Sequence, residues 1–203
     1  MYLARTRGCR VSGVDNNENG IATARQASAK AGLSERVHFQ VGDANLPLPF
    51  PVATFDAIVC IDAINHLADQ PAVLRDWIRL LRPGGHLLYS DPIIVSGPLS
   101  NEEIRQRSSI GFYLFVPLGY NERLLEQVGF RLEHVQDATE NASRVSGKWL
   151  ESRQRHQAGI IPLEGQERFD GLQAFFAAVH RLSSEKCLSR MVFIAQKPVA
   201  GAR

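Results

Sequence analysis

Several features that restrict function are scarce in this sequence of 203 residues. It has only three cysteines, Cys9, Cys60 and Cys187, which lie far apart. An odd number of scattered cysteines forms no disulfide framework and lacks the spacing of a metal site, so we expect mostly buried thiols in a reducing, cytoplasmic setting. The sequence also has no apolar run near the ~20 residues of a membrane-spanning helix, and its start lacks a secretory signal segment.

An excess of charge of either sign is also missing. The 23 basic residues nearly balance the 21 acidic ones, and the two kinds are interspersed. This argues against the basic surface typical of nucleic-acid binding and against a charged patch for a membrane surface. Five histidines stand alone without a second ligand at metal spacing, and we expect structural or surface roles for them: His38, His86, His134, His156 and His180. The basic segment 144–156 is interpreted mainly as a solvated helix face, with binding of an anionic substrate group as the alternative.

What is present is an alternation of short apolar runs with amphipathic segments. We expect strands at 8–14, 37–41, 55–61, 86–90, 130–135 and 190–196, and helices at 17–31, 71–81, 121–128, 139–157 and 167–184. Asn121 is expected to cap its helix, and Pro83-Gly84-Gly85 to separate a helix from a strand. The run 55–61 is almost entirely apolar, which is typical of a parallel strand buried on both faces. The fold class is therefore α/β.

Acidic residues follow these strands in a regular order. Asp15 closes the first run, Asp43 follows the second, Asp62 the third and Asp91 the fourth. Singly, Asp15 is also explained as a helix cap and Asp43 as a turn residue. Together, at spacings that place them along one carboxyl edge of a sheet, they predict a site for an adenosine-bearing cofactor.

The motif Leu81-Arg-Pro-Gly-Gly before a strand, together with these acids, makes the chain similar to the class I S-adenosylmethionine-dependent methyltransferases. The likeness covers about residues 1 to 135 and is greatest to the small-molecule group with ubiquinone/menaquinone-biosynthesis, sterol and phosphoethanolamine enzymes. It implies a Rossmann-like sheet and S-adenosyl-L-methionine as cofactor. By this resemblance Asp15 binds the ribose hydroxyls and Asn16 lies beside the adenine. Further cofactor contacts would come from Gly42, Asp43, Ala44, Ile61 and Asp62.

The sequence departs from the family pattern at its start. The Gly-rich loop of the form acid-x-Gly-x-Gly-x-Gly, with the strand before it, has no counterpart, and residues 1–8 resemble the end of the helix that follows that loop. We therefore expect an N-terminally truncated methyltransferase with its first strand missing. The expected organisation is one domain over 1–203, with lid or insertion segments at 97–120 and 139–184 after the fifth and sixth strands of the family.

The resemblance implies an in-line displacement in which a nitrogen, oxygen or carbon atom of a small molecule attacks the cofactor's methyl group. A base is needed only where that atom must lose a proton. The candidates are His66, Asp91 and, from the lid, Tyr113 or Tyr120. Each also has a structural interpretation: a helix-start histidine, a turn-capping acid and a core tyrosine.

Two other functions compete with this one. A nicotinamide-dependent dehydrogenase also places an acid after its second strand, but its Gly-rich fingerprint is equally missing. The stronger alternative is a catalytically inactive relative that serves as a binding or interaction module. The sequence identifies neither the methyl acceptor nor the oligomeric state.

Overall fold

The computed structural model describes residues 1–199 and divides into two compact units. The first unit is Met1–Phe50 and the second begins at Pro51. Each is described by itself below.

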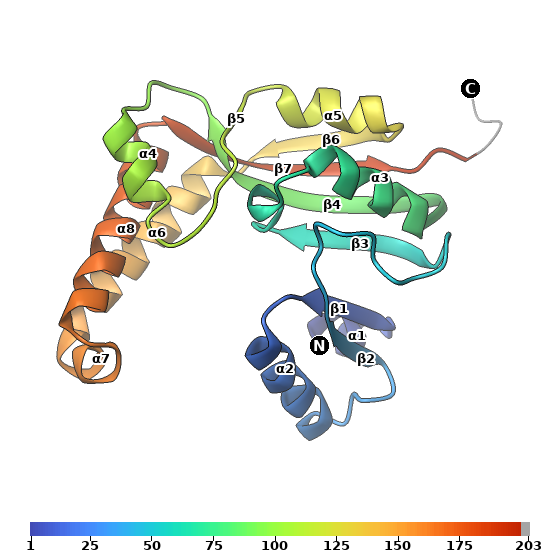
Figure 1. Ribbon diagram of the computed structural model, residues 1–203, viewed down its shortest axis with the longest axis horizontal. Helices are drawn as coiled ribbons and strands as arrows, with labels where there is room; N and C mark the ends of the chain where they lie inside the picture. The colour runs from blue at the N-terminus through green and yellow to red at the C-terminus, as the bar shows by residue number, and fades with distance from the viewer. Residues whose placement is uncertain (200–203) are drawn as a thin grey trace. The chain divides into compact units, whose positions relative to one another are not determined.

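The first unit is a two-stranded parallel sheet with two helices (Figure 1). Its elements are α1 (Tyr2–Arg7), β1 (Val11–Asp15), α2 (Glu18–Lys30) and β2 (Val37–Val41). The Asn17 side chain caps α2 by accepting a hydrogen bond from the backbone N–H of Gly20, which satisfies a donor that the helix leaves free. The buried side chains of Ala4, Leu33 and Val37 form its small core. The predicted strand–acid–helix–strand order is confirmed here.

The second unit is built on a mixed sheet. Its strands are β3 (Phe55–Ile61), β4 (Leu81–Val95), β5 (Val116–Pro117), β6 (Arg131–Asp137) and β7 (Leu188–Gln196). They are ordered β3-β4-β7-β6, and β5 pairs with β4. β3 runs parallel to β4, whereas β7 is antiparallel to both β4 and β6. The α/β class is confirmed, but the sheet is not wholly parallel, because β7 runs antiparallel to both of its neighbours.

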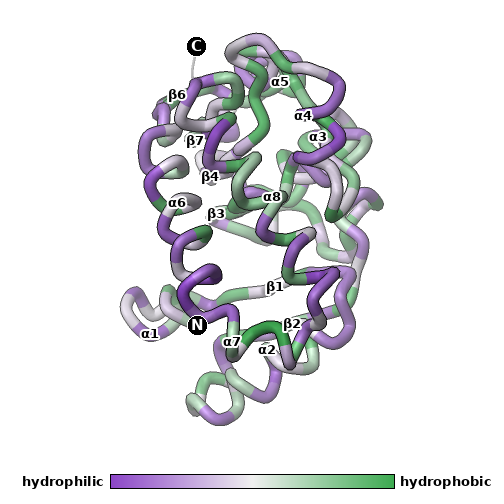
Figure 2. The backbone as a smooth tube through the Cα atoms, turned by 90° about the vertical axis from the view of Figure 1, so that its left-hand side faces the viewer, coloured by the Kyte–Doolittle hydropathy of each residue, from purple (hydrophilic) through white to green (hydrophobic). Residues whose placement is uncertain are grey.

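Helices flank this sheet and extend beyond it. They are the 3₁₀ turn η1 (Ile64–His66), α3 (Gln70–Leu80), α4 (Asn101–Arg107), α5 (Tyr120–Val128), α6 (Thr139–Arg155), α7 (Gln157–Glu164) and α8 (Gln166–Ser184). Figure 1 shows α6 and α8 as a long hairpin with α7 at its tip. In Figure 2 the hydrophobic residues of α7 stand out against the mainly hydrophilic α6. The helix expected over 139–157 ends at Arg155. A separate short helix, α7, which the sequence did not indicate, lies between it and α8.

The expected burial of 55–61 on both faces is wrong. The side chains of Val59 and Ile61 are 53% and 52% exposed. Val59 and Ile61 are two positions apart, so their side chains point to the same face of β3, and that face is open to solvent.

Two smaller expectations are also corrected. Pro83-Gly84-Gly85 lies within β4, at an irregularity where the pairing of β3 passes from Leu81 to His86, and does not precede the strand. Asn121 is not a cap: α5 begins after Gly119, and Asn121 is 1% exposed because its amide bonds other buried groups. Of the cysteines, Cys187 is buried, Cys60 half-buried and Cys9 exposed.

Gly85 offers a test of the packing at this irregularity. A Cβ atom there would lie 2.9 Å from the carbonyl oxygen of Arg82 and 3.1 Å from that of Asp56. Backbone atoms cannot yield as side chains do, so we expect Gly85→Ala to lower the free energy of unfolding by about 1–3 kcal/mol. Both tryptophans, Trp77 and Trp149, lie in the second unit, so their fluorescence during urea unfolding reports on this unit.

Gly171→Ala is the matched control. Gly171 lies inside α8, and a Cβ atom there has no neighbour within 4 Å. The same added methyl group should therefore raise the free energy of unfolding by about 0.5–1 kcal/mol, because alanine favours the helix. Equal destabilisation by both changes would contradict the packing argument.

Candidate functional site

Asp15 lies at the carboxyl end of β1, where its exposed carboxylate is partly engaged. Its Oδ1 accepts a hydrogen bond of 2.8 Å from the backbone N–H of Asn17, and its carbonyl accepts one of 3.0 Å from Gly42. Among residues 1–199 its Oδ2 has no hydrogen-bond partner. The local turn therefore fixes the carboxylate and leaves one oxygen available to hydroxyl groups of a ligand.

Asp43 lies beside the same edge because β1 and β2 are parallel and Asp15 is in register with Val41. Its Oδ1 accepts hydrogen bonds of 2.9 Å from both the backbone N–H and the Nδ2 of Asn45. The backbone N–H of Asn45, followed by its side chain, holds the pKa of Asp43 below its ordinary value. Asp43 is thus a fixed, ionised acceptor at neutral pH.

The other residues predicted in the first unit lie close in sequence to these two acids. Asn16 is exposed, and Gly42 and Ala44 are half-buried. A Cβ atom on Gly42 would come within 2.9 Å of Val14 Cγ1, so a side chain there would crowd the end of β1. The first unit therefore presents two carboxylates, with small residues between and beside them, at one edge of its sheet.

Asp62 follows β3 in the second unit and has an unusual backbone. Its φ is +52°, in the left-handed region that side chains rarely adopt. Its carboxylate is held by Ser90, whose hydroxyl donates a bond of 2.5 Å, and by Arg190, whose Nε lies 2.8 Å from Oδ1 and 3.1 Å from Oδ2. The neighbouring Ile61 has an exposed side chain at the end of the strand.

His66 ends the short 3₁₀ turn after Asp62. Its Nδ1 lies 2.8 Å from the carbonyl oxygen of Phe112, and since a carbonyl only accepts, Nδ1 carries the proton. In the neutral ring Nε2 is then the free base. The ring of Tyr113 lies 4.5 Å from that of His66, and the backbone N–H of Leu114 donates to the Asn65 carbonyl at 2.8 Å. The structure therefore brings together two of the three predicted catalytic residues, His66 and Tyr113.

Asp91, the third candidate, is completely buried in β4. Its Oδ1 accepts from the backbone N–H of Ile93 at 3.0 Å and its Oδ2 from Asn121 Nδ2 at 3.2 Å. Tyr89 donates its hydroxyl to Asn121 Oδ1 at 3.0 Å, which completes a buried chain of polar groups. Burial raises the pKa of Asp91 above its ordinary value and also raises that of Tyr89.

Arg107, at the end of α4, is a buried cation that sequence reasoning missed. It is 6% exposed, and its guanidinium lies 4.4 Å from the ring centre of Tyr113 and 5.1 Å from that of Phe175. Its Nη1 is buried without a hydrogen-bond partner. The only signal in the sequence was an arginine on a short polar helix, which is ordinarily exposed. Arg107 thus places positive charge on the aromatic residue that contacts His66.

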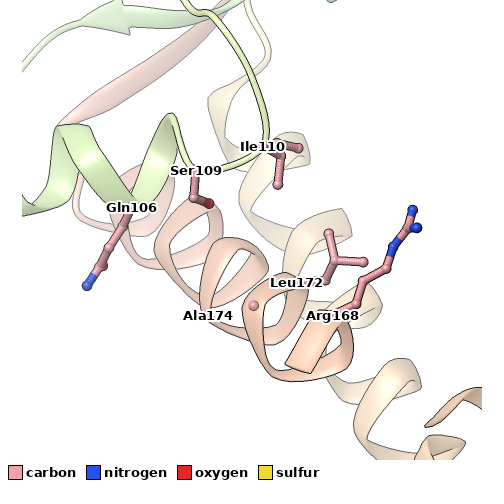
Figure 3. A pocket seen from close by; sticks show the side chains of 7 residues that line it. Gln106, Ser109, Ile110, Arg168, Leu172 and Ala174 are labelled. Atoms are coloured by element: carbon pink, nitrogen blue, oxygen red, sulfur yellow. The ribbon is translucent and has the colours of Figure 1, made fainter. Parts of the chain in front are cut away.

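A groove of about 500 Å³ lies between the end of α4 and α8 (Figure 3). Gln106, Ser109 and Ile110 line one side, and Arg168, Leu172 and Ala174 line the other. The lining mixes apolar and polar side chains. Within residues 1–199 no cluster of three or more His, Cys, Asp or Glu side chains is placed to hold a metal ion. No helix in that range has both the length and the apolar character needed to cross a membrane.

Comparison with known proteins gives a consistent result. A family described as "Methyltransferase domain" matches residues 1–89. This span contains all seven predicted cofactor contacts and His66. The chain is 26% identical over 203 residues to 27-O-demethylrifamycin SV methyltransferase of Amycolatopsis mediterranei, covering 98% of this chain and 72% of that protein.

Two further matches agree. Phosphoethanolamine N-methyltransferase 1 of Triticum aestivum is 29% identical over 197 residues, covering 97% of this chain but only 39% of its own length. The solved structure of Haemonchus contortus phosphoethanolamine N-methyltransferase 2, in complex with phosphomonomethylethanolamine and S-adenosylhomocysteine, has a TM-score of 0.86 at 25% identity. That match covers 97% of this chain and 45% of the solved chain. The chain thus spans less than half the length of these two relatives.

Proposed function

Because the chain belongs to the class I S-adenosylmethionine-dependent methyltransferases, we propose that it transfers a methyl group from S-adenosyl-L-methionine to a small-molecule acceptor. The observation that carries this proposal is the family match over residues 1–89, which contains His66 and three of the four strand-end acids, Asp15, Asp43 and Asp62. The cofactor supplies an electrophilic methyl group on a positively charged sulfur atom. The acceptor supplies a nitrogen, oxygen or carbon nucleophile.

The first unit has groups suited to the adenosine part of the cofactor. We assign the ribose hydroxyls to Asp15, whose Oδ2 is available, and the adenine amino group to Asp43, which is ionised and fixed by Asn45. Asn16, Gly42 and Ala44 complete the adenine contacts. A carboxylate that accepts two ribose hydroxyls stabilises binding through charge-assisted hydrogen bonds.

In the second unit we assign Ile61 and Asp62 to the cofactor as well. Ile61 offers an exposed apolar side chain, and Asp62 a carboxylate whose charge is shared with Arg190.

We assign the role of general base to His66. Its Nδ1 is committed to the Phe112 carbonyl, so Nε2 accepts the proton that a hydroxyl or amine nucleophile loses. Tyr113 is assigned to the wall of the acceptor site, because its ring orients that of His66. Asp91 is assigned an indirect role, because its carboxylate is buried and bonded to Asn121 and the Ile93 backbone. The lid segments 97–120 and 139–184 are proposed to cover the acceptor.

Calorimetric titration with S-adenosylhomocysteine tests the cofactor assignment. We expect Asp15→Asn to weaken binding by about 10–100-fold, because it removes the charge from a carboxylate that accepts ligand hydroxyls. Asparagine keeps an oxygen for the Asn17 N–H, so the turn is preserved. Asp170→Asn, at an exposed acid of α8, is the matched control and should leave the affinity unchanged.

The same experiment separates the enzyme from its main rival. Binding of the cofactor, followed by transfer of an isotopically labelled methyl group in a screen of hydroxylated and amino-bearing small molecules, supports the proposal. An inactive binding module would give no transfer to any acceptor in the presence of bound cofactor. Tight binding by Asp15→Asn would refute the ribose assignment.

A further inference from the structure

Among the residues assigned to the proposed site, Asp62 has the most unusual backbone. A non-glycine residue with φ of +52° is strained, and such residues persist only where their surroundings hold them. Asp62 is directly followed by the turn that carries His66. Whatever holds Asp62 in this conformation therefore also sets where that turn begins.

Residues of two strands beyond β3, namely β4 and β7, hold it. Ser90 on β4 accepts from the Asp62 N–H through its carbonyl at 3.2 Å and its hydroxyl oxygen at 3.0 Å, and its own hydroxyl donates to Asp62 Oδ1. Arg190 on β7, 128 residues away in the chain, donates through Nε to both carboxylate oxygens. Ser90 is fully buried and lies in the strand between the other two. We call Asp62, Ser90 and Arg190 the sheet-edge clamp.

Arg190 is itself fixed from a fourth element. Its backbone N–H donates to Thr139 Oγ1 at 3.0 Å, and its carbonyl accepts from Ala138 N at 2.8 Å. Thr139 is buried at the start of α6. The main chain of Arg190 is therefore bonded to the start of α6, and its guanidinium is bonded to Asp62. Arg190 is thus not a mobile surface cation.

We propose that Arg190 is a positioning residue for catalysis. Together with Ser90, it holds the Asp62 carboxylate and so keeps Asp62 in its left-handed conformation. That conformation places the His66 turn against the carbonyl of Phe112. This role rests on the proposed function of His66. It also gives the antiparallel strand β7 a part in the site. In the absence of Arg190 the Asp62 carboxylate loses its ionic partner, the strained conformation loses a restraint, and the His66 ring loses its single orientation.

The test uses nuclear magnetic resonance on the full chain without any ligand. In the wild type we expect the ¹⁵N signals of His66 to show one neutral tautomer, with the proton on Nδ1. Arg190→Gln should make the Asp62 amide exchange with solvent about tenfold faster, as expected for loss of a charge-assisted hydrogen bond, and should mix the His66 tautomers. Arg190→Lys should fall between the two. Arg131→Gln removes a cation from another ion pair of the same sheet and should change neither signal.

A second pair of variants tests the backbone argument. Glycine adopts a left-handed φ without strain, whereas alanine does not. Asp62→Gly should therefore disturb the His66 signals less than Asp62→Ala does. The proposal is overturned if Arg190→Gln leaves both the Asp62 amide and the His66 ring unchanged, or if the glycine variant disturbs His66 as much as the alanine variant.

These readouts separate this inference from the proposed function. Neither signal requires cofactor or acceptor, so a chain that transfers no methyl group still reports on the clamp. With an acceptor in hand, Arg190→Gln should lower kcat about 100-fold, as misplacement of a reacting group does. An unchanged kcat with altered His66 signals would refute the catalytic role of the clamp.

Discussion

Replacing His66 by glutamine is expected to lower kcat for methyl transfer to a hydroxyl or amine acceptor by about 10²–10⁴-fold, the usual contribution of general base catalysis. The reason is geometric. The Phe112 carbonyl fixes the proton on Nδ1 and leaves Nε2 as the base, and Tyr113 holds the ring from its side. Glutamine retains a donor for that carbonyl but supplies no group that accepts a proton at neutral pH. The affinity for S-adenosylhomocysteine should stay the same, because the change removes only the base.

The control for this experiment is His134→Gln. His134 is exposed on β6 of the same unit, so its replacement matches the chemistry without touching the site. A His66→Gln enzyme with wild-type kcat would assign the proton to another acceptor.

Replacing Asn121 by alanine is expected to lower the free energy of unfolding of the second unit by about 3 kcal/mol, because it leaves buried polar groups without partners. The Asn121 amide is the link between the Tyr89 hydroxyl and the Asp91 carboxylate. Without it, a buried carboxylate loses one of its two donors and a buried hydroxyl loses its acceptor. Urea unfolding followed by tryptophan fluorescence measures the change, and Asn141→Ala, at an exposed position of α6, should have an effect below about 0.5 kcal/mol.

The pH dependence of stability gives an independent check on this buried network. Burial raises the pKa of Asp91, so the folded state holds the proton to a higher pH than the unfolded chain does. As pH rises from the ordinary range of a carboxyl group through the raised pKa, the unfolded state ionises first and the contribution of Asp91 to stability is lost. Above the raised pKa the loss is complete and stability no longer changes on account of Asp91.

Asp91→Asn removes this titration. The neutral side chain can keep the network if the Asn121 amide turns over, because Asn121 Oδ1 then accepts from Asn at 91 and Nδ2 donates to the Tyr89 hydroxyl. We therefore expect the free energy of unfolding of the variant, relative to wild type, to rise with pH over that range and then to level off. A difference that does not depend on pH would show that Asp91 titrates alike in the folded and unfolded states.

The sequence by itself determined the local helices and strands and the order in which the site residues follow them along the chain. Asp15 and Asp43 follow strands whose alternation and caps are encoded within a few residues, and both strands, 11–15 and 37–41, form where apolar periodicity indicates them. The same holds for β3, for α3 with Pro71 in its first turn, and for the end of α5 at Gly129 with φ of +100°. These features depend on backbone preferences and short-range hydrogen bonds, which are properties of the chain over a few residues.

Only the tertiary structure decided which of these residues meet. Arg190 reaches Asp62 across 128 residues, Phe112 fixes the tautomer of His66 across 46, and Asn121, expected as a cap, bonds Asp91 and Tyr89 instead. Exposure of Val59 and Ile61 likewise follows from an uncovered face of β3, not from its composition. The physical reason is that burial, charge pairing and strand direction depend on neighbours brought together by chain topology, and no local pattern specifies those neighbours.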